Sequence, residues 1–206
     1  MSSIPPSPAL LPPETIFGRL DPGGPGLTRA EEFEHWDQDD ANPLELIGGW
    51  VLPLSPGNAK SGTASGNLYA ALLPLVRSKK WFITQDALHR LPQPLDTVVY
   101  PDISIHTIED VPYLPGTESI GRVPEFIVEF LSKKTYERDM APRGAKFLAF
   151  QMSGVREYYY SWPDGRDASG FALQNGVFAP IAKDGEGFFA SPFLGRSVRL
   201  VEAMVR

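Results

Sequence analysis

Two acidic residues stand inside apolar, β-rich stretches of the chain, where a strand normally carries no charge. Asp102 lies in the run 100–105, and Glu129 lies in the run 124–132. Charged side chains are rarely buried without a partner. A divalent cation with oxygen ligands satisfies two carboxylates that converge from buried strands. The two runs therefore predict a metal site built from Asp102 and Glu129.

Alternation along the two runs predicts which residues share a face. In a single strand over 98–105, Asp102 and Ser104 lie on one face, and in the second run Ile127 and Glu129 share a face. If the strands are neighbours, both carboxylates reach one ion, such as Mg²⁺, which binds substrate phosphate and activates water. The alternative interpretation is that Asp102 belongs to a strand-entry turn and that Glu129 pairs with an arginine.

Two further residues are candidates for the same site. Glu45 lies between Leu44 and Leu46 in an otherwise apolar strand, and its alternative is an outward-facing position. Lys146 borders the apolar stripe of the helix predicted after Ser132, where its ammonium could hold an attacking water or stabilise developing charge. Its alternative is a surface lysine whose stem covers apolar area. The basic residues around this helix, the part of an acidic chain best suited to phosphates, are Lys133, Lys134, Arg138 and Arg143.

Composition limits the chemistry that the chain can carry. The formal charge of −6 argues against binding nucleic acid by bulk electrostatics, although bound metal ions can supply local positive charge. The absence of cysteine excludes disulfides, thiolate zinc sites and cysteine nucleophiles. With only three histidines, a histidine-rich zinc site is not expected. The N-terminus lacks the features of a signal peptide and no apolar run is long enough to span a membrane, so the expected location is the cytoplasm.

The chain divides into an arm and one domain. Residues 1–26 hold seven prolines and no apolar periodicity, which predicts a flexible or extended arm before a domain over 27–206. The expected helices are a short one from a capping box at 28–31, one over 65–77 that Pro74 kinks or shortens, and one after Ser132 that ends at Gly154. The expected strands and hairpins are a hairpin over 44–52 at Gly48-Gly49, strands at 81–84, 98–105, 124–131 and 156–162, a hairpin over 171–181 at Asn175-Gly176, and a final strand within 196–204. This order predicts a mixed sheet flanked by helices, in the α/β or α+β range, with a C-terminal hairpin.

Other reaction classes have weaker support in the sequence. A G-x-S-x-G nucleophile elbow and a Gly-rich phosphate loop are both missing. A glycosidase that uses Asp102 and Glu129 as its carboxylate pair stays open as an alternative, with the aromatic run 158–162 stacking on sugar.

Several segments together resemble the Uma2 family of restriction-endonuclease-like proteins, within the PD-(D/E)xK nuclease superfamily. The resemblance covers about residues 28–202 and leaves out the Pro-rich arm. The segments that carry it are Leu44-Glu45-Leu46-Ile47-Gly48-Gly49, Tyr100-Pro101-Asp102-Ile103-Ser104, Pro124-Glu125-Phe126-Ile127-Val128-Glu129-Phe130-Leu131-Ser132, Gly154-Val155-Arg156-Glu157-Tyr158-Tyr159 and Ser191-Pro192-Phe193-Leu194-Gly195.

The resemblance implies a restriction-endonuclease-like core, often dimeric, and a role for each candidate. Asp102 matches the Asp of the PD motif, Glu129 matches the acidic residue of the third strand, and the acid of the E-L-I-x-G segment matches Glu45. The superfamily lysine usually lies two positions after that third-strand acid, where this chain has Leu131, and Lys146 on the next helix is the best match. Asp139 falls at an acidic position of that helix. Mg²⁺ or Mn²⁺ would be held by Asp102, Glu129 and the backbone carbonyl of Phe130.

One departure from the family pattern concerns the segment after the first hairpin. Family members usually carry a His soon after this Ser-Pro, whereas Ser55-Pro56 leads here to Gly57-Asn58-Ala59-Lys60. The leading hypothesis is a metal-dependent endonuclease acting on DNA. The alternative is a catalytically inactive member of the same fold that acts as a binding protein, which the acidic charge and the missing His favour.

Overall fold

The computed structural model describes residues 28–36, 43–54, 59–92, 95–110, 113–132, 136 and 144–200, and the backbone of 204–205. The predicted arm, Asp139 and the basic cluster before residue 144 lie outside these residues. The helices are α2 (Ala30–Phe33), α3 (Ala59–Ser78) and α4 (Ala145–Ser153). The strands are β1 (Leu44–Ile47), β2 (Trp50–Pro53), β3 (Phe82–Thr84), β4 (His89–Leu91), β5 (Thr97–Val99), β6 (Ile103–His106), β7 (Phe126–Phe130), β8 (Glu157–Ser161), β9 (Ser169–Gln174), β10 (Val177–Pro180), β11 (Phe189–Ser191), β12 (Arg196–Arg199) and β13 (Met204–Val205).

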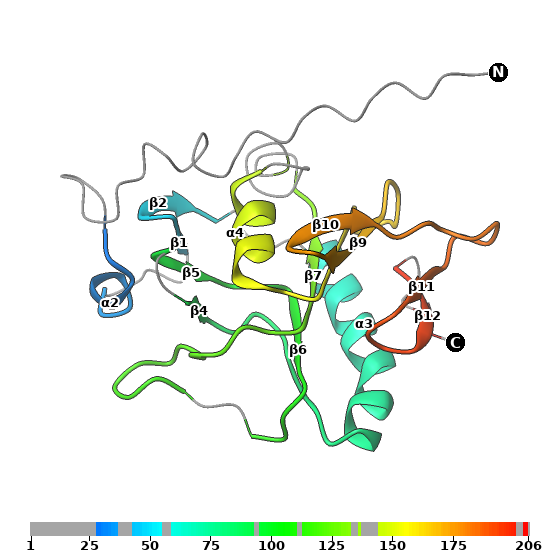
Figure 1. Ribbon diagram of the computed structural model, residues 1–206, viewed down its shortest axis with the longest axis horizontal. Coiled ribbons are helices and arrows are strands. Elements are labelled where there is room, and N and C mark those ends of the chain that lie inside the picture. The colour runs from blue at the N-terminus through cyan, green and yellow to red at the C-terminus, as the bar shows by residue number, and fades with distance from the viewer. Residues whose placement is uncertain are drawn as a thin grey trace.

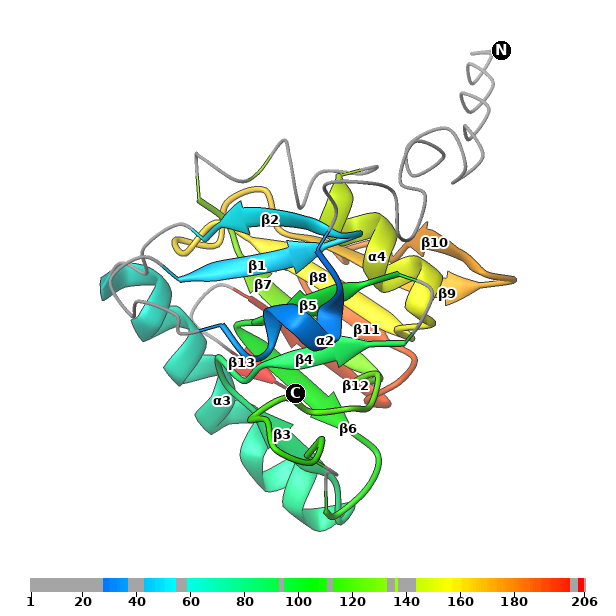
Figure 2. The same cartoon turned by 90° about the vertical axis from the view of Figure 1, so that its left-hand side faces the viewer.

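In the described part of the chain, the strands form three sheets. The largest has six strands in the order β10-β9-β8-β7-β6-β3, with β7 and β8 parallel and the other neighbours antiparallel. A four-stranded sheet has the order β2-β1-β5-β4, and β11, β12 and β13 form the third. Figure 2 shows the four-stranded sheet with α2 against it. The prediction of a mixed sheet flanked by helices is confirmed.

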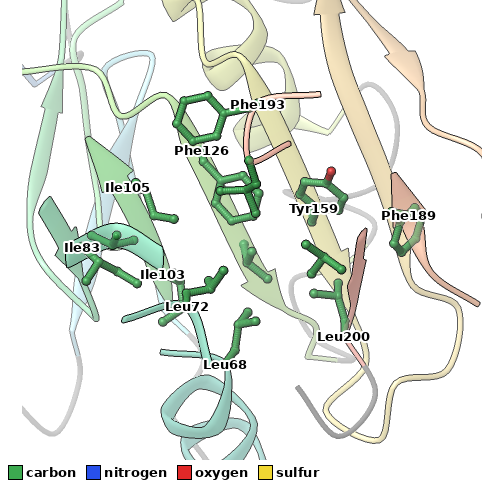
Figure 3. Close-up of a cluster of buried hydrophobic side chains, with 14 of the residues drawn as sticks. Leu68, Leu72, Ile83, Ile103, Ile105, Phe126, Tyr159, Phe189, Phe193 and Leu200 are labelled. Carbon is green, nitrogen blue, oxygen red and sulfur yellow. The ribbon is translucent and has the colours of Figure 1, made fainter. Parts of the chain in front are cut away.

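The six-stranded sheet is covered by a different helix on each face (Figure 1). On one face α3 places Leu68 and Leu72 against Ile103, Ile105 and neighbouring residues (Figure 3). On the other face α4 places Phe147 and Phe150 against the side chains of β8 and β9. Because successive residues of a strand alternate between faces, β6 and β7 are buried on both sides; β7 is apolar except for Glu129, whereas β6 alternates isoleucine with Ser104 and His106. Among the described helices, none combines the length and apolar character that a membrane span needs.

The turns at the two predicted hairpins follow from their glycines. Gly48 and Gly49 have φ angles of 59° and 82°, and Asn175 and Gly176 have φ angles of 51° and 80°. Positive φ at both central residues is what a type I′ hairpin turn requires, and Gly and Asn adopt it most readily. Both hairpins, β1–β2 and β9–β10, are confirmed by their antiparallel pairing.

The start of α2 differs from the predicted capping box. Its N-cap is Arg29, which makes no side-chain capping bond. Asp96, far along the chain, accepts a hydrogen bond from the Ala30 backbone N–H at 3.2 Å and pairs with Arg29 at 3.0 Å. A tertiary carboxylate therefore supplies the cap that the local sequence was expected to supply.

The predicted single strand over 98–105 is wrong, because the chain changes sheets inside it. β5 pairs with β1 in the four-stranded sheet, whereas β6 pairs with β3 and β7 in the six-stranded sheet. Pro101 lies between the two strands and has no N–H to donate to a ladder. The break places Asp102 just before the first residue of β6, at the end of an inner strand of the larger sheet. The helix prediction over 65–77 was too short: α3 starts at Ala59 and continues through Pro74.

A buried glutamate ties the C-terminal sheet to the six-stranded sheet. Glu157 on β8 accepts hydrogen bonds from the Tyr159 hydroxyl at 2.8 Å, the Ser191 hydroxyl at 2.6 Å and the Phe193 backbone N–H. We expect Glu157→Ala to destabilise the fold by about 2 kcal/mol, because it leaves buried donors without an acceptor. Urea unfolding measures the change, with exposed Glu186→Ala as the control; an unchanged midpoint for Glu157→Ala would contradict this role.

Candidate active site

Asp102 and Glu129 come together because β6 and β7 are antiparallel neighbours. Ile103 pairs with Val128, so one residue further along this register Asp102 lies opposite Glu129. The Phe130 backbone N–H donates a hydrogen bond to Asp102 Oδ2 at 2.6 Å, and Ser65 Oγ on α3 donates to the Asp102 backbone carbonyl at 3.2 Å. The predicted convergence of these carboxylates on one face is therefore observed, although Asp102 precedes its strand.

Lys146 lies over this pair from α4, on the face of the sheet that carries Glu129. Its Nζ atom is 2.7 Å from Glu129 Oε1 and 2.8 Å from Glu45 Oε1. Lys146 is the second residue of α4, which begins after Gly144 in an extended conformation and ends at Gly154 with a φ angle of 86°. Phe147 and Phe150 pack on the sheet and so fix the helix that carries the lysine. The alternative of a surface lysine is excluded, because the Lys146 side chain is only 2% exposed.

Glu45 reaches the site from the four-stranded sheet. It lies on β1, is fully buried, and its Oε1 accepts a hydrogen bond from the Tyr100 backbone N–H at 2.9 Å. The same oxygen contacts Lys146, so Glu45 joins the lysine to the segment that crosses between the two sheets. The alternative of an outward-facing strand residue is thus wrong.

The electrostatics of the cluster follow from three carboxylates around one ammonium. Burial raises the pKa of Asp102 to about 6, against the Phe130 N–H and Lys146, which lower it. Burial also raises the pKa of Glu129 well above its usual value, with Asp102 and Glu45 raising it further and Lys146 opposing them. Burial lowers the pKa of Lys146, but the two glutamates raise it by more, so the ammonium stays charged. Three carboxyl groups therefore surround a single lysine, and burial opposes the ionisation of two of them.

An aspartate that the sequence reasoning missed lies beside the cluster. Asp86 follows β3 and interacts electrostatically with both Lys146 and Asp102. Its position depends on the pairing of β3 with β6, which no short motif in the sequence reveals. The only local sign of Asp86 in the sequence is that it follows shortly after the apolar run 81–83. In the described residues, no group of three or more carboxylates or histidines is arranged to hold an ion by direct ligation alone.

Comparisons with known proteins place this arrangement in a family. The family model Uma2, described as "Putative restriction endonuclease", matches residues 30–200. Among solved structures, the chain is similar to a crystal structure of a "putative nuclease belonging to DUF820" from Anabaena variabilis, with a TM-score of 0.65 and 13% identity. That similarity covers 84% of this chain and 95% of the other, and at this identity it shows the fold alone. No curated protein matches the chain. The chain belongs to the Uma2 family.

Proposed function

We propose that this chain is a metal-dependent endonuclease that hydrolyses phosphodiester bonds in DNA. The observation that carries the proposal is the ion pairing of Lys146 with Glu129 and Glu45 next to Asp102. Two carboxylates at the ends of neighbouring strands, with a lysine beside them, are the groups that metal-assisted phosphate hydrolysis needs. The family to which the chain belongs supports the same reaction class.

The donor set fits a hard divalent cation. The cluster offers carboxylate oxygens, and its histidine-free, cysteine-free chemistry suits Mg²⁺ or Mn²⁺. A bound cation would favour the ionised forms of Asp102 and Glu129, whose pKa values burial raises. Asp102, Glu129 and the backbone carbonyl of Phe130 would hold it. When bound, the cation supplies Lewis-acid polarisation of the phosphate and lowers the pKa of water.

The protein groups around the phosphate have distinct tasks in this proposal. Lys146 holds a positive charge at a fixed position, where it stabilises the negative charge that develops on phosphate oxygens during attack. Glu45 is a positioning residue, because it contacts Lys146 Nζ and the Tyr100 N–H rather than the edge where Asp102 lies. The Phe130 N–H fixes the orientation of the Asp102 carboxylate.

A binding protein without catalysis is the second candidate. It is favoured by the formal charge of −6, which provides little bulk attraction for a DNA backbone. In that case the buried ion pairs of Lys146 serve stability alone.

The test of the endonuclease is cleavage of supercoiled plasmid and of single-stranded DNA with Mg²⁺ or Mn²⁺, against EDTA. We expect metal-dependent cutting that Glu129→Gln and Asp102→Asn each reduce by more than about 100-fold, since each removes a cation ligand. Glu109→Gln, at an exposed loop position away from the cluster, is the matched control. Thermal unfolding establishes that the variants fold. Equal rates in the wild type and in Glu129→Gln would overturn the assignment, and wild-type protein without any cutting would favour the binding protein.

A further inference from the structure

Asp86 lies two residues beyond the end of β3, the strand that pairs with β6. Thr84, the last residue of β3, lies opposite Ser104, and Asp102 directly precedes β6, so both aspartates lie near the same end of this strand pair. The chain bends after Thr84, so strand alternation does not extend to Asp86. β6 lies between β3 and β7, so Asp86 and Glu129 come from the two strands that neighbour β6.

Asp86 differs from the other carboxylates of the cluster in its exposure. Glu45 and Glu129 are fully buried, whereas the Asp86 side chain is exposed to solvent. It still interacts electrostatically with both Lys146 and Asp102, which places it at the rim of the cluster.

The backbone conformation at Asp86 limits which side chains fit there, and this supports a specific role for its carboxylate. Its φ angle is 50°, in the left-handed region that most side chains avoid and that Asp and Asn tolerate. The turn places an acidic group beside a cluster that already holds three carboxyl groups and one lysine. Like charges raise each other's energy, so the position costs stability unless a cation is shared.

We propose that Asp86 is a third carboxylate of the cation site, acting at longer range than Asp102 and Glu129 by accepting hydrogen bonds from water that hydrates the cation. This rests on the proposed metal-dependent function. The described residues provide no three carboxylates arranged for direct ligation, which agrees with a contact through water. Mg²⁺ and Mn²⁺ sites with few protein ligands keep several waters, and groups that orient such water are worth about 10–100-fold in affinity.

The test is calorimetric titration of the full chain with MnCl₂. We expect Asp86→Asn to weaken Mn²⁺ binding by about 10–100-fold, while Glu129→Gln removes it. Asn keeps the left-handed backbone, so the change removes charge and not the turn. Asp167→Asn is the matched control, because Asp167 is exposed and has the same φ angle of 50°. We expect it to bind Mn²⁺ as the wild type does.

The outcomes separate this inference from the function on which it rests. Wild-type affinity in Asp86→Asn, together with loss in Glu129→Gln, overturns the role of Asp86 and leaves the cation site standing. A wild-type chain that binds no Mn²⁺ overturns both. An equal loss in Asp86→Asn and Asp167→Asn would trace the effect to general surface charge and also overturn the role of Asp86.

Discussion

Lys146→Met is expected to destabilise the fold by about 3–5 kcal/mol at neutral pH, the cost of removing one partner from a buried ion pair. Methionine keeps most of the length of the side chain, so packing against the sheet is largely preserved. Glu45 and Glu129 then face each other and Asp102 without the ammonium that now lies within 2.8 Å of both glutamates. The loss comes from uncompensated charge and not from a cavity.

Because the loss of stability in Lys146→Met comes from unpaired buried charge, it depends on pH in a direction that can be predicted. Burial raises the folded-state pKa values of Glu129 and Asp102 above their unfolded values, and loss of Lys146, which lowers both, raises them further, so protonation favours the fold. The destabilisation is therefore smallest at low pH and grows as the pH rises through the raised pKa values. Urea unfolding of Lys146→Met and of the wild type between pH 5 and pH 8 measures it.

A matched variant and a compensating variant complete this experiment. Lys80→Met removes a charge from an exposed turn and is expected to leave stability within about 0.5 kcal/mol of the wild type. Adding Glu45→Gln and Glu129→Gln to Lys146→Met removes the unpaired charges and should recover part of the loss. A pH-independent loss that these changes do not reduce would show that Lys146 acts through packing.

Acidification from pH 7 to pH 5 is expected to cost roughly 2 kcal/mol for each of two buried histidines. His89 on β4 and His106 on β6 are both fully buried, with parallel rings and their Nε2 atoms 3.1 Å apart. The Ala87 carbonyl lies 2.7 Å from His89 Nδ1 and can only accept, so that nitrogen carries the proton in the neutral ring. His89 Nε2 is then an acceptor, and His106 Nε2 donates to it.

Protonation of His89 would place its Nε2–H against the Nε2–H of His106, and protonation of His106 would add a buried charge at its Nδ1, which has no hydrogen-bond partner among the described residues. Burial lowers the pKa of His89 to about 4, with the hydrogen bond to Ala87 opposing it. Burial, then His89 and Arg122, lower the pKa of His106 to about 3. The folded-state values lie below the unfolded value near 6.5, so the unfolded chain binds more protons in acid. Stability is complete above about pH 6.5 and falls as the pH drops towards 4.

The measurement is the free energy of unfolding against pH, with His35 as an internal comparison. His35 is exposed, so His35→Asn should keep the acid-dependent loss, whereas His89→Asn and His106→Asn should each reduce it. If those variants do not fold, NMR titration of the wild-type imidazoles decides the matter. The prediction fails if His89 and His106 titrate between pH 6 and pH 7.

The sequence predicted which residues the structure brings together better than it predicted the path of the chain between them. Asp102, Glu129 and Glu45 could be singled out because each is a charge in an apolar run, and Lys146 because it borders the apolar stripe of a helix; the resemblance to Uma2 then assigned them expected roles. The strand over 98–105 failed because alternation of apolar residues cannot tell which sheet each half joins. Pro101 was the local signal for the break. Its missing N–H cannot join a ladder of backbone hydrogen bonds, so the strand ends there although the apolar pattern continues.

Other features depend on contacts between distant segments and leave no local trace. Asp96 caps α2 from more than 60 residues away, which no capping motif encodes. β4 has three residues, too few for a periodic pattern, so the pairing of His89 with His106 was not foreseen. Asp86 became visible as a candidate only when the register of β3 against β6 was known.

The cluster around Lys146 can form only late in synthesis, because its lysine follows all of its carboxylates along the chain. Glu45 leaves the ribosome about 100 residues before Lys146, and Asp102 and Glu129 emerge between them. Until α4 is made, a nascent chain carries the carboxylates without the ammonium that binds two of them. A message cut short before residue 146 therefore yields a product that cannot assemble the site.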